Sequence, residues 1–186
     1  MKHKPPGRSA GQARELLRVP LASPDMRLAI LADTHLPRGH RTVPAGCLDR
    51  CRQADAILHA GDLIDTPVLD LLRSLGRPVH AVRGNVDSAA LRTILPDRLE
   101  LDFDGVRIGM LHIPGPATGR LERLRAAFPD ADAVVFGHTH TPEHAESAGF
   151  QIFNPGSSTD RRRAPDHTMG IATLADGRLT FELHVV

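Results

Sequence analysis

Short, uninterrupted apolar runs recur in the first half of the chain, and helical patterns separate them. Residues 27–32, 56–59 and 78–82 have the composition of strands that are buried on both faces. Between them, residues 44–53 and 66–76 carry helical patterns, each with a proline near its start. Strands that alternate with helices in this way predict parallel pairing, because a parallel connection needs a crossover.

The pattern changes after residue 95. Residues 99–103 alternate, Asp104-Gly105 is typical of a tight turn, and residues 106–111 return as a strand, which predicts an antiparallel hairpin. The remaining chain is expected to form a helix over 121–128 and strands over 133–136, 151–153, 169–174 and 179–185. The two halves together predict an α/β fold in which two mixed β-sheets pack face to face as a sandwich flanked by helices.

A chain of 186 residues is most simply one domain, large enough to bury an apolar core without disulfides. We expect this domain to span residues 26–186, because Met26 stands immediately before the first strand. Residues 1–25 begin with a stretch rich in Lys, Pro and Arg and are expected to form a flexible basic extension. A weak helix is expected around Glu15 to Arg18 within it.

Composition argues against several classes of protein. Lys and Arg number 23 against 22 Asp and Glu, and Trp and Tyr are absent, so there is no strong signal for nucleic-acid binding. No apolar run approaches the roughly 18–20 residues of a membrane helix, and the N-terminus lacks the apolar segment of a secretory signal. Cys47 and Cys51 lie in a predicted helix and favour buried, reduced thiols over a zinc-ligand pair. A cytoplasmic protein is therefore expected.

Polar side chains of metal-ligand type follow five of the predicted strands. In α/β sheets, ligand sites gather at the carboxyl ends of strands, so blocks that are distant in sequence can meet in one cleft. Every donor is a carboxylate, an amide oxygen or an imidazole, a set that suits one or two ions of the Mn, Fe, Zn or Ni type better than a Cys-zinc knot. The candidate ligands are Asp33, His35, Asp62, Asn85, His112, His138 and His140.

Each block alone has an ordinary explanation. Asp-x-His is a frequent coincidence, and a lone histidine such as His112 is commonly packed or solvated. Gly-Asp and Gly-Asn are common turn dipeptides. Five such blocks in order, each at the end of a strand, argue against coincidence.

The order of the blocks is Asp-x-His, Gly-Asp, Gly-Asn-x-Asp, His and Gly-His-x-His. In this order they resemble the calcineurin-like metallophosphoesterase superfamily, and most closely its small YfcE-type phosphodiesterases, a branch whose fold the retromer subunit Vps29 shares. The strings His59-Ala60-Gly61-Asp62 and Asn154-Pro155-Gly156-Ser157 strengthen this resemblance, which extends over residues 27–186.

The resemblance implies a site for two divalent ions, with Asp62 bridging them. It assigns Asp33, His35 and His140 to one ion and Asn85, His112 and His138 to the other. Manganese is the first expectation, with iron, zinc or nickel as alternatives. A hydroxide that bridges the ions would attack phosphorus in a small phosphoester, with Asp62 and Asn85 at the catalytic centre.

The sequence also departs from the family pattern beside the expected site. Val86 stands where many relatives have histidine, so this position offers no general acid. His40 is a candidate proton donor, against the alternative of a solvated loop residue. Arg161 and Arg162 are candidates for binding a substrate phosphate, against a solvated charge run. Asp87 is expected to orient the neighbouring asparagine or to cap the following helix.

The sequence thus predicts a metal-dependent phosphoesterase, with a phosphodiester as the expected substrate. The alternative is a catalytically weak metal-binding scaffold of the Vps29 type that acts through protein partners. The full set of seven ligand candidates favours the enzyme. The sequence gives no indication of the oligomeric state.

Overall fold

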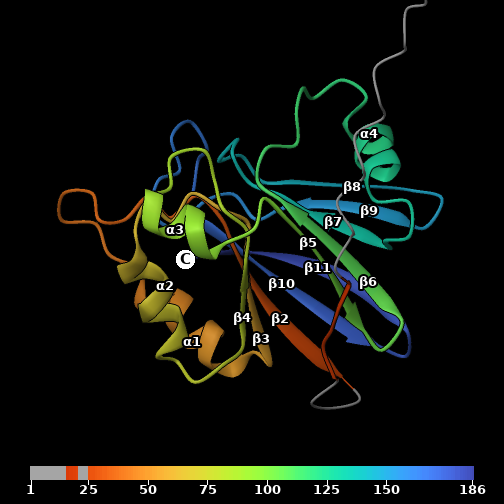
Figure 1. Ribbon diagram of the computed structural model, residues 1–186, viewed down its shortest axis with the longest axis horizontal. Helices are drawn as coiled ribbons and strands as arrows, with labels where there is room; N and C mark the ends of the chain where they lie inside the picture. The colour runs from red at the N-terminus through yellow and green to blue at the C-terminus, as the bar shows by residue number, and fades with distance from the viewer. Residues whose placement is uncertain (1–15, 21–24) are drawn as a thin grey trace, which may run out of the picture.

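The computed structural model describes residues 16–20 and 25–186, and their strands form two sheets packed face to face (Figure 1). Helices cover the outer face of each sheet. Each sheet contains both parallel and antiparallel pairs. The predicted fold class, an α/β sandwich of two mixed sheets flanked by helices, is confirmed.

The first sheet has five strands in the order β11-β10-β2-β3-β4. Its strands β2, β3 and β4 are parallel, which confirms the pairing predicted for the first half of the chain. Strand β10 is antiparallel to both of its neighbours, β2 and β11. The bounds are β2 (Met26–Leu31), β3 (Ala56–His59), β4 (Val79–Ala81), β10 (Thr168–Ala175) and β11 (Arg178–Val185).

The second sheet has six strands in the order β1-β5-β6-β7-β9-β8. The predicted hairpin is present as β5 and β6, which pair antiparallel around Asp104-Gly105. Strand β7 lies parallel between β6 and β9. The bounds are β1 (Leu16–Arg18), β5 (Arg98–Phe103), β6 (Val106–Leu111), β7 (Ala133–Val135), β8 (Glu143–Ser147) and β9 (Phe150–Asn154).

Alternating side chains of β2 separate two apolar layers. Leu28 and Ile30 belong to the core between the sheets, whereas Ala29 and Leu31 pack on the opposite face beneath helices. Four helices provide the outer layers. Three of them, α1 (Ala45–Gln53), α2 (Thr66–Arg73) and α3 (Ala89–Ile94), cover the five-stranded sheet, and α4 (Arg120–Ala127) covers the six-stranded sheet.

Two local predictions differ from the structure. The weak helix expected around Glu15 to Arg18 is wrong, because Leu16–Arg18 is strand β1, which pairs in parallel with β5. Strand β8 was not predicted, because its residues are polar and partly or fully exposed and so carry no apolar pattern. Most of the expected basic extension, residues 1–15 and 21–24, lies outside the described residues, so its flexibility stays a prediction.

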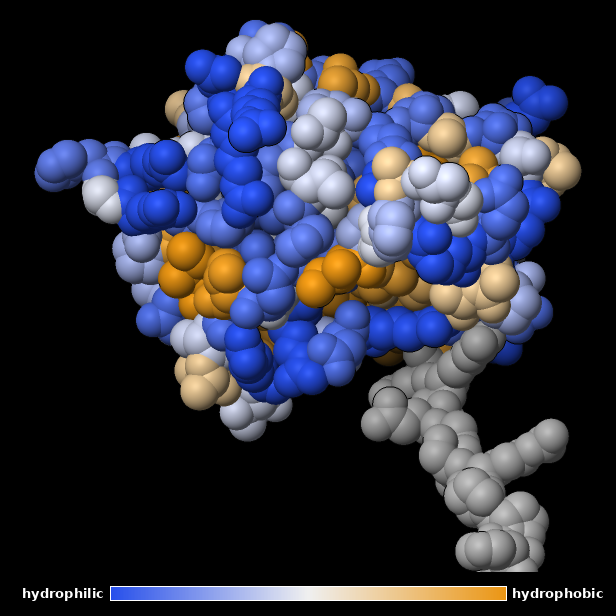
Figure 2. Space-filling view, turned by 90° about the horizontal axis from the view of Figure 1, so that it is seen from above, coloured by the Kyte–Doolittle hydropathy of each residue, from blue (hydrophilic) through white to orange (hydrophobic). Residues whose placement is uncertain are grey.

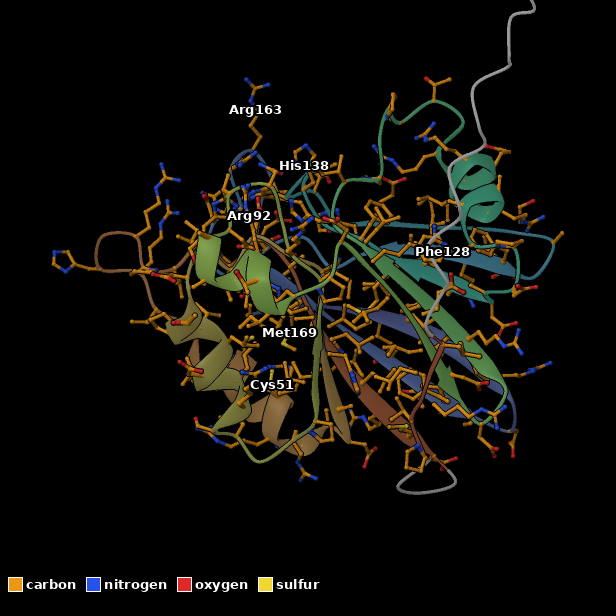
Figure 3. The ribbon with its side chains drawn as sticks, viewed as in Figure 1. Cys51, Arg92, Phe128, His138, Arg163 and Met169 are labelled. Atoms are coloured by element: carbon orange, nitrogen blue, oxygen red, sulfur yellow. The ribbon has the colours of Figure 1, made fainter. Side chains whose placement is uncertain are left out.

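Five strands, β2, β3, β4, β6 and β7, end in the loops that carry the candidate metal ligands. Figure 3 shows His138 near this edge of the sandwich, with Arg163 extending away from it. Hydrophilic residues cover most of this face, and apolar patches lie between them (Figure 2). None of the helices in the described part of the chain is both long and apolar enough to cross a membrane.

Candidate metal centre

Five of the candidate ligands adopt a backbone conformation that is uncommon outside glycine. The φ angles are +55° at Asp33, +48° at His35, +58° at Asp62, +73° at His138 and +59° at His140. Asp and His tolerate this left-handed region better than most residues. Strands β2, β3 and β7 are therefore each followed by a sharp change of direction, and these turns aim side chains from separate loops at one place.

The first donor set consists of Asp33, His35 and His140. One ligand atom from each of these buried side chains lies within 4.8 Å of the others. Asp33 Oδ1 is 3.4 Å from His140 Nε2 and 3.8 Å from His35 Nε2. Both Asp33 carboxylate oxygens and both Nε2 atoms are buried without a hydrogen-bond partner among the described residues. Such an arrangement has a high energetic cost unless a cation or other group occupies it.

The second donor set consists of Asp62, His112 and His138, joined by Asn85. The first three again place one ligand atom each within 4.8 Å of one another. Asn85 Oδ1 lies 3.1 Å from His112 Nε2 and 2.9 Å from His138 Nδ1. The carboxylate of Asp62, the amide oxygen of Asn85 and two imidazoles are therefore close enough to bind one ion together.

Asp62 lies between the two sets. Its Oδ2 atom is 3.4 Å from His35 Nε2 and 3.2 Å from His112 Nε2. Its Oδ1 atom accepts a hydrogen bond of 3.0 Å from the backbone N–H of Val86. The Oδ1 atom of this carboxylate is therefore fixed by the backbone, while its Oδ2 atom faces donors of both sets.

Backbone carbonyls orient two of the imidazoles. His112 Nδ1 donates to the carbonyl oxygen of Ala60 at 2.8 Å, and His140 Nδ1 donates to that of Asp160. With the proton on Nδ1, the Nε2 lone pair of each ring faces the site, which is the tautomer that a metal ligand needs.

The carboxylates and imidazoles strongly perturb one another's pKa values. Burial lowers the pKa of His35, but the nearby carboxylates of Asp33 and Asp62 outweigh burial and raise it to about 9. Burial would raise the pKa of Asp62, yet His112 and His35 hold it well below its usual range. The carboxylates therefore attract positive charge, which either protons or metal ions can supply.

The donors fit divalent metal ions of the borderline class. Carboxylate oxygens and imidazole nitrogens converge in two adjacent groups, and no thiolate belongs to either group. In the first group these donor atoms are buried and have no hydrogen-bond partner among the described residues. Mixed oxygen and nitrogen donors of this kind suit manganese, iron, zinc and nickel. The structure therefore brings together all seven predicted ligands, although their roles as ligands stay a prediction.

Glycines leave room for the loops to meet. A Cβ atom added at Gly84 would overlap both the side chain and the backbone of Asp62. A Cβ atom at Gly61, where φ is +91°, would lie 2.8 Å from His112 Nδ1. At Gly84 the requirement is space, and at Gly61 it is both space and backbone conformation.

Neighbouring polar residues hold the loops rather than face the site. Asp87 accepts hydrogen bonds from the N–H groups of Ile64 (2.7 Å) and Gly84 (2.6 Å). It therefore braces the loop that carries Asn85, while Ser88 caps α3. His59 is fully buried between Thr34 Oγ1 and the N–H of Gly61, and burial lowers its pKa to about 3.

The structure separates the other predicted site residues. His40 is exposed, and no hydrogen bond or ion pair within the described chain holds it near the donors. Arg161 is exposed and donates to the carbonyl oxygen of Ala164 at 2.6 Å. Arg162 is exposed, but its charge contributes to lowering the pKa of His138 and His140, after burial. Of the three, Arg162 is the residue whose charge acts on the donors.

Sequence reasoning missed two contributors. Asp160 orients His140 through its carbonyl oxygen, and its carboxylate pairs with Arg41 at 3.1 Å. Arg92, on α3, donates to the carbonyl oxygen of Asn85 at 2.7 Å. Neither lies in a metal-type motif, and the only available signal was proximity in sequence to Arg161 or to the Asn85 block.

Comparison with known proteins identifies relatives over most of the chain. The family model of the calcineurin-like phosphoesterase superfamily domain matches residues 26–177. A probable metallophosphoesterase of Methanocaldococcus jannaschii is 34% identical over 137 residues, covering 72% of this chain and 69% of the relative. A probable metallophosphoesterase of Methanothermobacter thermautotrophicus is 33% identical over 136 residues, which cover 72% of this chain and 78% of the relative.

Solved structures share the fold. Vps29 of Entamoeba histolytica in complex with Zn²⁺ is 26% identical, with a TM-score of 0.67 over 86% of this chain and 99% of that one. A Thermotoga maritima protein is 29% identical, with a TM-score of 0.69 over 87% and 99%. An archaeal phosphodiesterase is 22% identical, with a TM-score of 0.67 over 87% of this chain and 100% of that one. At this identity the similarity shows a shared fold alone.

Proposed function

Because this chain belongs to the calcineurin-like phosphoesterase superfamily, we propose that it is a metal-dependent phosphoesterase, with a small phosphodiester as the preferred substrate. The observation that carries the proposal is the position of Asp62. One of its oxygen atoms faces His35 at 3.4 Å and His112 at 3.2 Å, as a ligand shared by two ions requires.

We propose that Asp33, His35 and His140 hold one ion, that Asn85, His112 and His138 hold the other, and that Asp62 belongs to both. Manganese is the first candidate, and iron, zinc and nickel remain alternatives. Two bound divalent ions would supply Lewis acidity toward the phosphoryl oxygens and would lower the pKa of a water molecule to the neutral range.

The remaining roles belong to the protein chain. The N–H of Val86 holds Asp62, and Ala60 and Asp160 set the tautomers of His112 and His140. Arg162 would attract the substrate phosphate, since its charge already reaches two of the donor histidines. We keep Arg161 as a weaker candidate for substrate binding, because its side chain is already bonded to Ala164.

The proposed donor set includes no residue that would donate a proton to the leaving group. Val86 is apolar, 44% exposed and adjacent to Asn85, so it cannot act as an acid. His40 remains a candidate only if its exposed loop closes over the site. The chain would therefore act best on esters whose leaving groups need little protonation.

A metal-binding scaffold is the alternative function. The observation that favours it is the similarity to Vps29 of Entamoeba histolytica, whose structure was solved in complex with Zn²⁺. Metal binding alone therefore does not distinguish a hydrolase from a scaffold, and the deciding observation is turnover.

The test combines metal analysis with turnover. The purified protein, loaded with Mn²⁺, is assayed on bis(4-nitrophenyl) phosphate and 4-nitrophenyl phosphate, beside Asp62→Asn and the matched surface control Asp49→Asn, whose side chain is 63% exposed. We expect metal-dependent turnover that Asp62→Asn abolishes and Asp49→Asn keeps. Bound metal without turnover above the Asp62→Asn background would favour the scaffold instead.

A further inference from the structure

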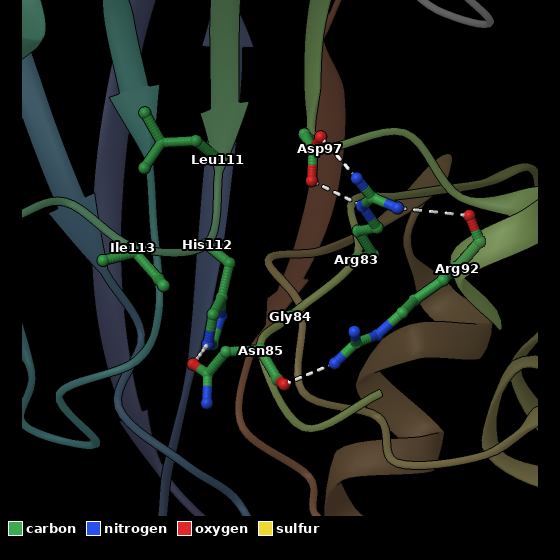
Figure 4. Close-up of a pocket in the computed structure, with 8 residues that line it drawn as sticks. All are labelled: Arg83, Gly84, Asn85, Arg92, Asp97, Leu111, His112 and Ile113. Atoms are coloured by element: carbon green, nitrogen blue, oxygen red, sulfur yellow. Dashed lines mark hydrogen bonds and ion pairs between the residues drawn. The ribbon is translucent and has the colours of Figure 1, made fainter. Parts of the chain in front are cut away.

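A cavity of about 550 Å³ opens directly beside the second donor set (Figure 4). Asn85 and His112 form part of its wall and belong to that set. The rest of the wall comes from the end of β6, the loop after β4, helix α3 and the segment before β5. A volume of this size is typical of sites for small organic ligands. A group attached to a phosphate at the donors would therefore have space here.

The two arginines that line the cavity differ in whether a carboxylate pairs with them. Arg83 forms a two-point ion pair with Asp97, through Nε to Oδ1 and through Nη2 to Oδ2 at 2.6 Å. Arg92 has no carboxylate within ion-pair distance among the described residues, and its guanidinium donates to backbone carbonyls instead. Arg92 is thus the cation of this wall that forms no ion pair with a described residue, although its charge contributes, after that of Arg83, to lowering the pKa of Asp97. It favours a ligand that carries or develops negative charge.

Two carbonyl groups hold the Arg92 guanidinium beside the donors. Nε donates to Asp87 at 2.9 Å, and Nη2 donates to Asn85 at 2.7 Å. Figure 4 shows the guanidinium reaching from α3 toward the loop that carries Asn85. Nη1 takes part in no hydrogen bond within the part of the chain that the structure describes. A positioned N–H donor therefore remains available to a ligand.

We propose that this cavity binds the leaving group of the phosphoester and that Arg92 stabilises the negative charge on the departing oxygen. The proposal rests on the proposed function and names the substrate class, which is a phosphoester of an acidic alcohol, such as a phenol. It also accounts for Val86, because a fixed positive charge takes the place of an acid at this loop.

The chemical step balances without a protein acid. A P–O bond forms between phosphorus and the oxygen of water, and the P–O bond to the leaving group breaks with its electron pair on the leaving oxygen. The proton of the water passes to solvent. Arg92 keeps its own proton, because a guanidinium does not ionise near neutral pH, so the departing oxygen is protonated from solvent after release. Acidic alcohols leave more readily under these conditions than alkyl alcohols.

The test compares two leaving groups on the same phosphate. Methyl 4-nitrophenyl phosphate and methyl phenyl phosphate are assayed with Mn²⁺-loaded wild type, Arg92→Gln and Arg92→Lys. If Arg92 stabilises the leaving oxygen, Arg92→Gln should lose about tenfold more kcat/KM with the phenyl ester than with the nitrophenyl ester, because charge on the poorer leaving group needs more stabilisation. Arg92→Lys, which keeps the charge, should recover part of this difference.

The matched control is the double variant Arg83→Gln/Asp97→Asn, which removes a neutralised pair from the same cavity. Any loss it shows should be the same for both esters. Bound metal is measured for each variant, and Arg92→Gln should keep the wild-type stoichiometry.

The outcomes separate this proposal from the proposed function. Equal losses for both esters, or a loss of bound metal in Arg92→Gln, would show that Arg92 only positions Asn85 and would overturn the leaving-group role while leaving the phosphoesterase in place. Wild type that binds metal but hydrolyses neither ester would overturn both proposals together.

Discussion

At the scale of single residues, the backbone of the donors matters as much as their identity. Asp33, His35, Asp62, His138 and His140 all have positive φ angles. Such conformations cost on the order of 1–3 kcal/mol each and persist only where surrounding contacts determine them. The backbone hydrogen bonds from the N–H of Asp33 to Gly61 and from the N–H of His35 to Asp62 are contacts of this kind. The strain is thus concentrated where ligand atoms must converge.

A substitution at Gly84 would test how closely the donor loops pack against each other. We expect Gly84→Ala to lower the free energy of unfolding by about 2 kcal/mol, because the new methyl group overlaps Asp62. It should also weaken metal binding, measured by titration calorimetry. The matched control is Gly46→Ala in α1, where the new Cβ would be 3.4 Å from its nearest neighbour, an Arg50 side-chain atom, and a small gain in stability is expected. Equal behaviour of the two variants would contradict this account.

His59 makes stability depend on pH. Its pKa is about 3 in the folded protein against 6.5 ordinarily, because burial disfavours the charged ring. The unfolded chain binds more protons between these two values, so the contribution is complete above pH 6.5 and is lost as pH falls toward 3. Between pH 7 and pH 5 we expect wild type to lose about 2 kcal/mol that His59→Asn does not lose. Urea unfolding of both metal-free proteins measures this, and a difference that stays constant with pH would refute it.

At the scale of elements, the sequence predicted best the strands that are buried on both faces. β2, β3 and β7 form continuous apolar runs because the core lies on one side and helices on the other. The edge strands β1 and β8 could not be predicted in this way. Leu16–Arg18 has good helix formers, and pairing with β5 overrides that preference. The polar residues of β8 give no strand pattern at all.

In the candidate site, too, the residue types could be predicted from the sequence pattern, but the contacts between loops could not. The donors were recognisable because their residue types recur at strand ends. Their positive φ angles, the contact of Arg92 with Asn85 and the carbonyl of Asp160 could not be recognised, because each depends on where separate loops meet. The exposure of His40 likewise could not be read from its position near a motif, because it depends on how the loop after Pro37 lies in the fold.

Strand β1 sets the boundary of the folded unit. We propose a single domain that contains residues 26–186, and the pairing of β1 with β5 adds Leu16–Arg18 to its sheet. A chain that starts at Met26 should be less stable than one that starts at Leu16 by about 1–3 kcal/mol, because Val19 leaves the core and the edge of β5 is uncovered. Thermal unfolding of the two chains measures this. Equal stability would show that β1 contributes nothing.

At the scale of the whole molecule, the donor sets join the two sheets. Loops of the five-stranded sheet carry Asp33, His35, Asp62 and Asn85, and loops of the six-stranded sheet carry His112, His138 and His140. Each proposed ion would therefore be bound by both sheets. A metal ion in such a position links the two halves of the sandwich.

This arrangement predicts strong stabilisation by metal. At a free Mn²⁺ concentration about 1,000 times the dissociation constant, binding should add about 4 kcal/mol to the free energy of unfolding, provided that the unfolded chain does not bind the ion. The melting temperature should rise with Mn²⁺ and fall with a chelator. Asp62→Asn should respond far less than the surface control Asp49→Asn, and a chelator-insensitive wild type would contradict the proposed site.

The pairing of β2 with β10 has a consequence for protein synthesis. Strand β2 is translated well before its neighbour β10, because β3 to β9 lie between them in the sequence. The five-stranded sheet, which carries four of the donors in its loops, is completed only after translation of β10 and β11, residues 168–185. A nascent chain that stops before these strands would therefore lack part of the sheet on which the donor loops are built.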